Sequence, residues 1–193
     1  MEASVNTVCL NCGQSHSMKA WTSIDVSREP SLKEKVLNGQ LFTWTCPTCG
    51  KVNLVKYPLM YHDPSQKLLL VLSDTALKVE DMPEGYVLRR VRSIGELVEK
   101  IKISDAGLDD VVMEMCKYVA RKELGNDSEL RFLKLEGPDN DIILTYPDKD
   151  SMQMISLGFN VYEDAMGIVS RHGGMKPEGL QTVDASWMAE LLA

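Results

Sequence analysis

Two segments decide how the N-terminal part of this chain folds: Cys9-Leu10-Asn11-Cys12-Gly13 and Cys46-Pro47-Thr48-Cys49-Gly50. Each is a C-x-x-C-G motif, in which two intervening residues let a tight turn aim both sulfurs at one point. The glycine that follows can adopt a positive φ, so the backbone can fold back and direct amide groups at the sulfurs. Two such turns supply four thiolates, the ligand set of a closed tetrahedral zinc site. We therefore predict one structural zinc ion per chain, held by Cys9, Cys12, Cys46 and Cys49.

The four cysteines have three alternatives to zinc binding: an iron site, a redox pair and disulfides. Iron suits the same tetrahedral sulfur site, as in a rubredoxin-like centre, and stays open as an alternative metal. A thioredoxin-like redox pair lies at the start of a helix, whereas Lys51-Val52-Asn53-Leu54-Val55 after the second motif is typical of a strand. Disulfides belong to oxidising compartments. The first residues show no basic region followed by an apolar run, so no secretory signal is indicated and we expect a cytoplasmic protein.

Composition and charge narrow the function classes. The chain has 193 residues, 44% of them hydrophobic, and a net charge of −7, which disfavours general nucleic-acid binding. Residues 1–60 carry six Lys/Arg against four Asp/Glu, and residues 61–193 carry fifteen against twenty-four. The longest strongly apolar stretch, residues 68–72, is too short to span a bilayer, so no membrane association is expected.

The pattern of residues predicts an α+β protein of two domains. Thirty-three residues separate Cys12 from Cys46, which exceeds the usual zinc-ribbon spacing. A strand and a short helix near residues 30–38 account for the extra length, so we predict a zinc-ribbon-like domain with an αβ insertion over residues 1–75. The polar stretch 76–85 is the predicted linker. A mixed α+β domain is predicted over residues 86–193, with a long helix at residues 108–124 that ends at Gly125.

Around the cysteines the chain carries, in order, Ser23-Ile24-Asp25-Val26, Glu29-Pro30-Ser31-Leu32-Lys33-Glu34-Lys35-Val36-Leu37-Asn38-Gly39, Phe42 and Pro58-Leu59-Met60-Tyr61-His62-Asp63. This order resembles the CpXC domain family, which is named for its two Cys-Pro-x-Cys motifs. The resemblance covers residues 5–75, continues more weakly to Lys117, and is absent beyond about residue 125. Leu10 departs from the family's proline, but proline there shapes the turn and ligates nothing. The resemblance implies metal binding.

Several other residues have a functional and a structural interpretation. Cys116 stands alone on the long helix, where a buried core position is expected. His16 follows Cys12 by four residues and is either an additional metal ligand or a residue without a role in metal binding. His62 either lines a cleft or is a polar residue at the end of a strand. His172 is expected to cap a helix. One charged set is either a solvated helix face or a ligand site between two helices: Arg89, Arg90, Arg92, Glu96, Glu99, Asp109, Asp110, Glu114 and Lys117.

The sequence contains no catalytic constellation, so it favours a non-enzymatic zinc-binding module that contacts another protein or has a regulatory role. The alternative is an enzyme or a small-ligand sensor, with a site in the C-terminal domain or at the domain junction.

Overall fold

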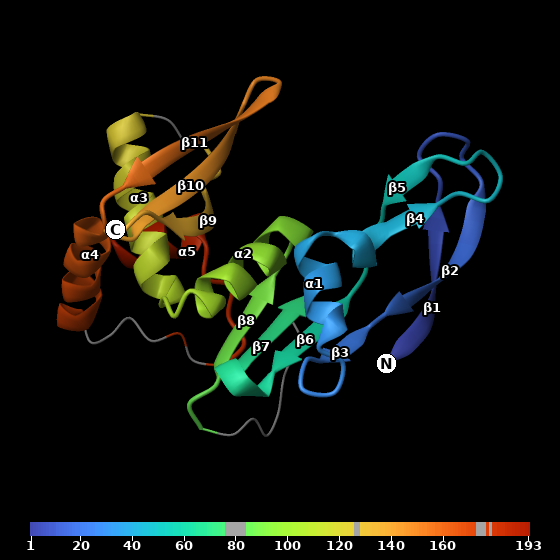
Figure 1. Ribbon diagram of the computed structural model, residues 1–193, viewed down its shortest axis with the longest axis horizontal. Coiled ribbons are helices and arrows are strands. Elements are labelled where there is room, and N and C mark those ends of the chain that lie inside the picture. Colours follow the sequence, from blue (N-terminus) through green and yellow to red (C-terminus); the bar gives the residue numbers. More distant parts are fainter. Residues whose placement is uncertain (76–83, 126–127, 173–176, 178) are drawn as a thin grey trace. The chain divides into compact units, whose positions relative to one another are not determined.

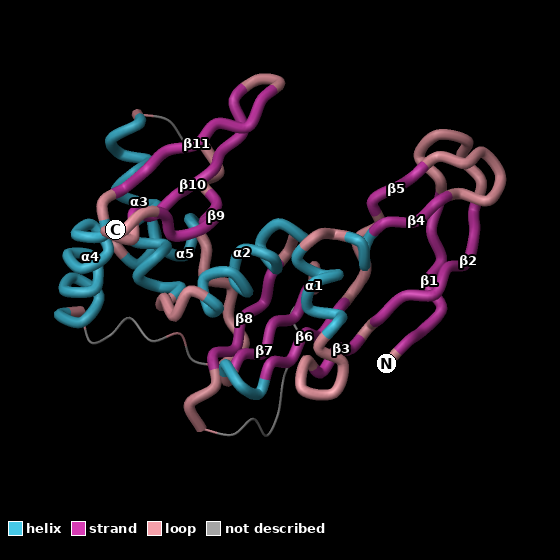
Figure 2. The backbone as a smooth tube through the Cα atoms, viewed as in Figure 1, coloured by secondary structure: helices cyan, strands magenta, loops and turns pink. Residues whose placement is uncertain are grey.

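The computed structural model describes residues 1–75, 84–125, 128–172, 177 and 179–193. The chain forms two compact units, Met1–Val98 and Glu99–Ala193. Both contain helices and strands, which confirms the predicted α+β class (Figures 1 and 2). Among the described residues, no helix is both long enough and apolar enough to cross a membrane.

The cysteine motifs lie in the turns of two antiparallel hairpins of the first unit. One hairpin pairs β1 (Glu2–Val8) with β2 (Ser15–Trp21), and the other pairs β4 (Thr43–Thr45) with β5 (Val52–Leu54). Their connecting loops lie side by side in Figure 2. This is the expected zinc-ribbon-like arrangement.

The other described strands of the first unit form a four-stranded sheet in the order β3-β6-β7-β8. Its members are β3 (Ser23–Asp25), β6 (Leu59–Asp63), β7 (Leu68–Leu72) and β8 (Val87–Val91). β6 and β7 are antiparallel, while β3 runs parallel to β6 and β8 runs parallel to β7. Every residue of β7 is buried, which explains its uninterrupted apolar sequence, because a strand covered on both faces needs no polar positions.

The predicted insertion between the two cysteine motifs consists of β3, α1 (Ser31–Leu37) and the short 3-10 turn η1 (Gln40–Phe42). α1 buries Leu32 and Val36, and the helix is followed by Gly39 at φ 78°. Lys33 on α1 pairs with the buried Asp63 at the end of β6, with 3.2 Å between Nζ and Oδ2. A second 3-10 turn, η2 (Pro64–Gln66), joins β6 to β7.

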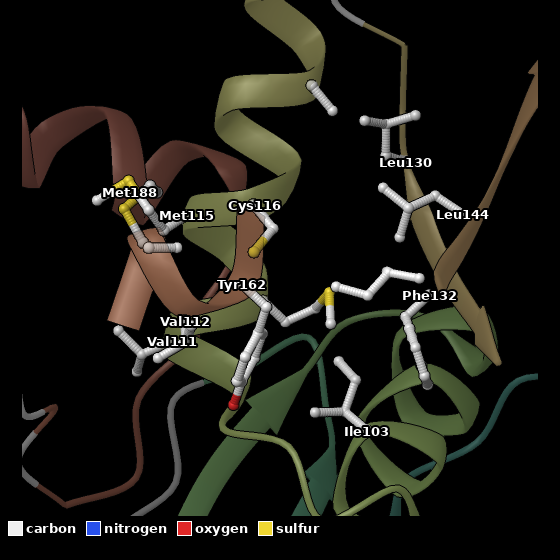
Figure 3. Close-up of a cluster of buried hydrophobic side chains, with 14 of the residues drawn as sticks. Ile103, Val111, Val112, Met115, Cys116, Leu130, Phe132, Leu144, Tyr162 and Met188 are labelled. Atoms are coloured by element: carbon white, nitrogen blue, oxygen red, sulfur yellow. The ribbon is translucent and has the colours of Figure 1, made fainter. Parts of the chain in front are cut away.

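The second unit packs helices around a three-stranded antiparallel sheet in the order β11-β10-β9. These strands are β9 (Arg131–Glu136), β10 (Asp141–Asp148) and β11 (Ser151–Leu157), and the helices are α3 (Asp110–Leu124), α4 (Phe159–Arg171) and α5 (Ala185–Leu191). Side chains from α3, α4, α5, β9 and β10 share one core, into which Cys116 and Tyr162 project (Figure 3). The two units meet in sequence within α2 (Ile94–Asp105).

The boundary between the two units lies between Val98 and Glu99, which is C-terminal to the predicted linker at residues 76–85. β8, which we expected to open the C-terminal domain, pairs along its length with β7 and belongs to the first unit's sheet. Local sequence patterns identify a strand but not its partner, so this pairing was not predictable from the residues of β8. Most of the predicted linker, residues 76–83, lies outside the described residues.

Candidate metal centre

The two cysteine turns have the same backbone geometry. In the first, the amide of Gly13 donates to the carbonyl of Cys9 at 2.9 Å, and the amide of Cys9 donates to the carbonyl of Gln14 at 3.0 Å. In the second, Gly50 donates to Cys46 and Cys46 donates to Lys51, each at 2.9 Å. Gly13 has φ 70° and Gly50 has φ 71°, values that L-residues with a side chain rarely adopt. The predicted positive φ is therefore present at both glycines, but their amides donate to the carbonyl groups of Cys9 and Cys46 rather than to sulfur.

The turns bring the four predicted sulfur atoms together. All four lie within 4.8 Å of one another. Sγ of Cys9 is 3.6 Å from Sγ of Cys49, and Sγ of Cys12 is 3.7 Å from Sγ of Cys46. A disulfide would need a separation of about 2.05 Å, whereas four sulfurs around a tetrahedral zinc ion with bonds of about 2.3 Å lie about 3.8 Å apart. The sulfur positions thus fit a metal ion that bridges the two hairpins.

Two asparagines support the sulfurs from outside the four-cysteine group. Nδ2 of Asn53 lies 3.5 Å from Sγ of Cys9, and the Asn53 side-chain oxygen accepts a hydrogen bond of 3.0 Å from the amide of Leu10. Nδ2 of Asn11 lies 3.6 Å from Sγ of Cys49. Donors of this kind stabilise thiolates and orient them. Neither asparagine was predicted from the sequence, although Asn11 lies within the first motif and Asn53 follows the second closely.

His16 lies beside the sulfur cluster. Its Nε2 is 3.7 Å from Sγ of Cys46 and 3.1 Å from the hydroxyl oxygen of Thr48, and its ring packs against Trp44 with 5.4 Å between centroids. Four cysteines complete a tetrahedral site without it. The histidine is therefore placed to contact a sulfur rather than to replace one.

The thiols differ in their tendency to ionise. A backbone hydrogen bond from Cys12 is the largest influence on Cys9 and, with the Asn53 side chain, lowers the pKa of Cys9 to about 6 against the opposing effect of burial. A backbone hydrogen bond from Gln14 favours the Cys12 thiolate, but burial and the neighbouring sulfurs together raise the pKa of Cys12 to about 12. Because like charges this close repel, four thiolates at these positions require a cation among them.

Cys116, His62 and His172, the other candidate residues, occupy positions in which each has a structural role. Cys116 is fully buried in the core of the second unit, as predicted, and burial raises its pKa to about 12. His62 lies between Asp25, with 3.7 Å from Nδ1 to the carboxylate, and Tyr86, with 3.2 Å from Nε2 to the hydroxyl. His172 is the C-cap of α4, as expected. Gly173 and Gly174, which follow it, lie outside the described residues.

Part of the charged set is buried and so does not form a solvated helix face, which was one of its two interpretations, whereas Arg92 and Asp109 are exposed. Four of its members, Glu99, Asp110, Glu114 and Lys117, are buried in the second unit. Lys117 pairs with Glu99 and Glu114, and two residues that the sequence analysis did not single out complete the network: Lys100 pairs with Asp110, and Arg131 pairs with Glu99. Asp109 caps the start of α3 by accepting hydrogen bonds from the amides of Val111 and Val112.

A comparison of the sequence with models of known protein families identifies the family to which the chain belongs. The family model described as CpXC protein matches residues 7–117, more than half of the chain, and the chain therefore belongs to the CpXC family. The match includes all four clustered cysteines and ends where the weaker resemblance in the sequence ended. No curated protein and no solved structure shows a significant match to the chain.

Proposed function

We propose that Cys9, Cys12, Cys46 and Cys49 hold one zinc ion per chain in a structural role. The observation that carries this proposal is the group of four sulfur atoms within 4.8 Å of one another, presented by two turns of matching geometry. Four protein ligands close a tetrahedral site and leave no position for a substrate, which is the pattern of structural rather than catalytic zinc. Iron would fit the same sulfurs, so metal analysis has to distinguish the two.

Measurement of metal content by elemental mass spectrometry tests the site. We expect about one zinc per wild-type chain and a loss of stoichiometric metal in Cys46→Ser, because three sulfurs and a hydroxyl bind zinc far less tightly than four thiolates. Cys116→Ala is the matched control, since this cysteine lies outside the cluster, and it should keep its zinc. Full metal content in Cys46→Ser would contradict the assignment, and iron in the wild-type protein would replace zinc in it.

We further propose that the cysteine hairpins form a protein-interaction surface in a cytoplasmic, non-enzymatic protein. Four large apolar residues are exposed on or beside these hairpins: Val8, Leu10, Val52 and Leu54. Leu10 is 88% exposed at a turn that carries two of the metal ligands. Asn53 is buried beside Cys9, so Val52 and Leu54 project from the opposite face of β5. Exposed apolar groups of this kind favour a protein partner with an apolar contact surface, whereas the net charge of −7 disfavours nucleic acid.

A double variant tests the interaction surface separately from the metal. Leu10→Ser with Leu54→Ser should keep one metal ion per chain, because neither leucine is a metal ligand. The double variant should lose partners that the wild-type chain captures from an extract of the source cells. Val87→Ser, which changes an exposed apolar residue of β8, is the control and should capture the same proteins as the wild type. Identical captured proteins for the wild type and the double variant would contradict the proposed surface.

A further inference from the structure

A cavity of about 540 Å³ opens between the last turns of α3 and the start of α5 in the second unit. It is lined by Tyr118, Arg121, Lys122, Gly125, Ala185, Ser186 and Ala189. Small-molecule sites typically occupy about 300–1,000 Å³, so the cavity is large enough for a metabolite-sized ligand. All of its lining residues follow residue 117, where the family match ends. The cavity is thus a feature of this chain's C-terminal part rather than of the matched family region.

The lining is cationic although the chain is acidic overall. Arg121 and Lys122 contribute two positive charges, and none of the described residues that line the cavity carries a carboxylate. Basic residues in the last turn of a helix also complement the helix dipole. That effect does not explain Arg121, whose Nη2 atom is buried and has no hydrogen-bond partner among the described residues. A buried charged donor without an acceptor is energetically costly. Because Nη2 is itself buried, an anion in the cavity would offset the charge of the Arg121 guanidinium as a whole rather than accept a hydrogen bond from this atom.

The remaining walls suit an apolar or aromatic body. Lys122 holds its Nζ 5.3 Å from the centroid of the Tyr118 ring, so the ammonium group and an aromatic wall lie together. Ala185 and Ala189 are four residues apart and share one face of α5, where their small side chains leave room. Ser186 adds a hydroxyl group that can donate to an anion.

We propose that this cavity binds a small organic anion, in which an aromatic or apolar body carries a phosphate or a carboxylate. Arg121 and Lys122 neutralise the anionic group, while Tyr118 and the alanines of α5 contact the body. This site is independent of the zinc proposal, because it lies in the other unit and uses no metal ligand. It assigns a ligand-binding role to a region for which the cysteine motifs imply none.

Titrations followed by amide chemical shifts in nuclear magnetic resonance test the proposal with three probes: phenyl phosphate, benzoate and uncharged phenol. At least one of the two anions should shift the amides of residues 118–125 and 185–189, and should bind at least about tenfold more tightly than phenol. Tighter binding of phenyl phosphate would identify a phosphate ligand, and tighter binding of benzoate a carboxylate ligand.

Three variants locate the binding. Arg121→Gln should weaken binding of the preferred anion by about tenfold or more. Lys134→Gln removes an equal charge from an exposed position on β9 and should leave the affinity unchanged. Ala189→Leu narrows the cavity without altering its charge and should also weaken binding, which keeps the test decisive if Arg121→Gln folds poorly. The proposal is overturned by an absence of shifts at these amides, by equal binding of phenol, or by an unchanged affinity in both Arg121→Gln and Ala189→Leu.

Discussion

At the residue scale, the metal centre depends on two glycines as well as on four cysteines. Gly13 and Gly50 adopt positive φ values in the two turns, and a Cβ atom built on either one meets no heavy atom within 4 Å. Crowding therefore does not explain why glycine stands there. The reason is the backbone conformation itself, which costs an L-residue with a side chain about 1–2 kcal/mol.

We expect Gly50→Ala to weaken metal binding about fivefold, which corresponds to about 1 kcal/mol of strain in the loaded turn. Gly167→Ala is the matched control because Gly167 lies within α4 at an ordinary helical φ, where its Cβ would meet only the end of the Arg171 side chain at 3.5 Å. That change should raise the free energy of unfolding by up to about 1 kcal/mol. A competition titration with a chelator measures the first effect, and urea unfolding measures the second. Equal metal affinity in Gly50→Ala and the wild type would show that the turn tolerates a side chain.

At the scale of elements, α3 illustrates how charged residues can occupy a buried helix. All residues from Asp110 to Lys117 are buried, so the first half of this helix is enclosed on every side. Its charges are tolerated because they are paired with charges from α2 and β9. Glu99 accepts from Nζ of Lys117 at 2.9 Å, from Nη1 of Arg131 at 3.1 Å and from the amide of Phe132 at 2.7 Å.

The pKa values of the two glutamates that pair with Lys117 are shifted in opposite directions. Burial alone would raise the pKa of Glu99, but the charges of Lys117, Lys100 and Arg131 lower it below its usual range. Burial raises the pKa of Glu114, and its Oε2 atom has no hydrogen-bond partner among the described residues. The fold therefore favours the ionised form of Glu99 and the protonated form of Glu114.

We predict that Glu99→Gln lowers the free energy of unfolding by about 3–5 kcal/mol, because it leaves the buried Lys117 and the partly buried Arg131 with too little negative charge. At pH 5, Glu114→Gln should lower the free energy of unfolding much less than Glu99→Gln does. A raised folded pKa means that the native state binds more protons at Glu114, so the contribution of this residue to stability falls as pH rises above its unfolded pKa of 4.5. Glutamine does not titrate, so Glu114→Gln should gain on the wild type between pH 5 and pH 7 in urea unfolding. A pH-independent difference between these two proteins would contradict the assigned direction.

At the scale of the whole molecule, the chain consists of two compact units that differ in how they are stabilised. The first, Met1–Val98, contains the four-cysteine cluster and the two small hairpins around it. The second, Glu99–Ala193, has one apolar core shared by its helices and sheet. Short hairpins bury little surface, so metal binding and folding are expected to be coupled in the two cysteine hairpins of the first unit.

Removal of the metal should consequently loosen one unit and spare the other. After chelation, hydrogen exchange measured by mass spectrometry should accelerate at the amides of residues 9–14 and 46–51 by at least about tenfold, which corresponds to a loss of about 1.4 kcal/mol of local stability. The amides of α3 and α4 should keep their protection. If both units lost protection together, the chain would unfold as a single cooperative structure and the distinction between the units would fail.

Features that depend only on neighbouring residues could be predicted from the sequence. The spacing of each C-x-x-C-G motif identified the four clustered cysteines, the breaker residues located the short helix near residues 30–38, and helical periodicity located α3 with its end at Gly125. These inferences succeed because turn chemistry and amphipathic periodicity act over a few residues.

Features that depend on distant partners became known from the tertiary structure. It assigned β8 to the sheet of the first unit, supplied Lys100 and Arg131 to the buried network around Glu99 and Lys117, and formed the cavity between α3 and α5. A strand's neighbour, the burial of a charge and the walls of a cavity arise from long-range packing, which places side chains from separate segments together. Local propensity carries no information about such partners, because the same charged helix face is favourable in water and, when fully paired, tolerable in a core.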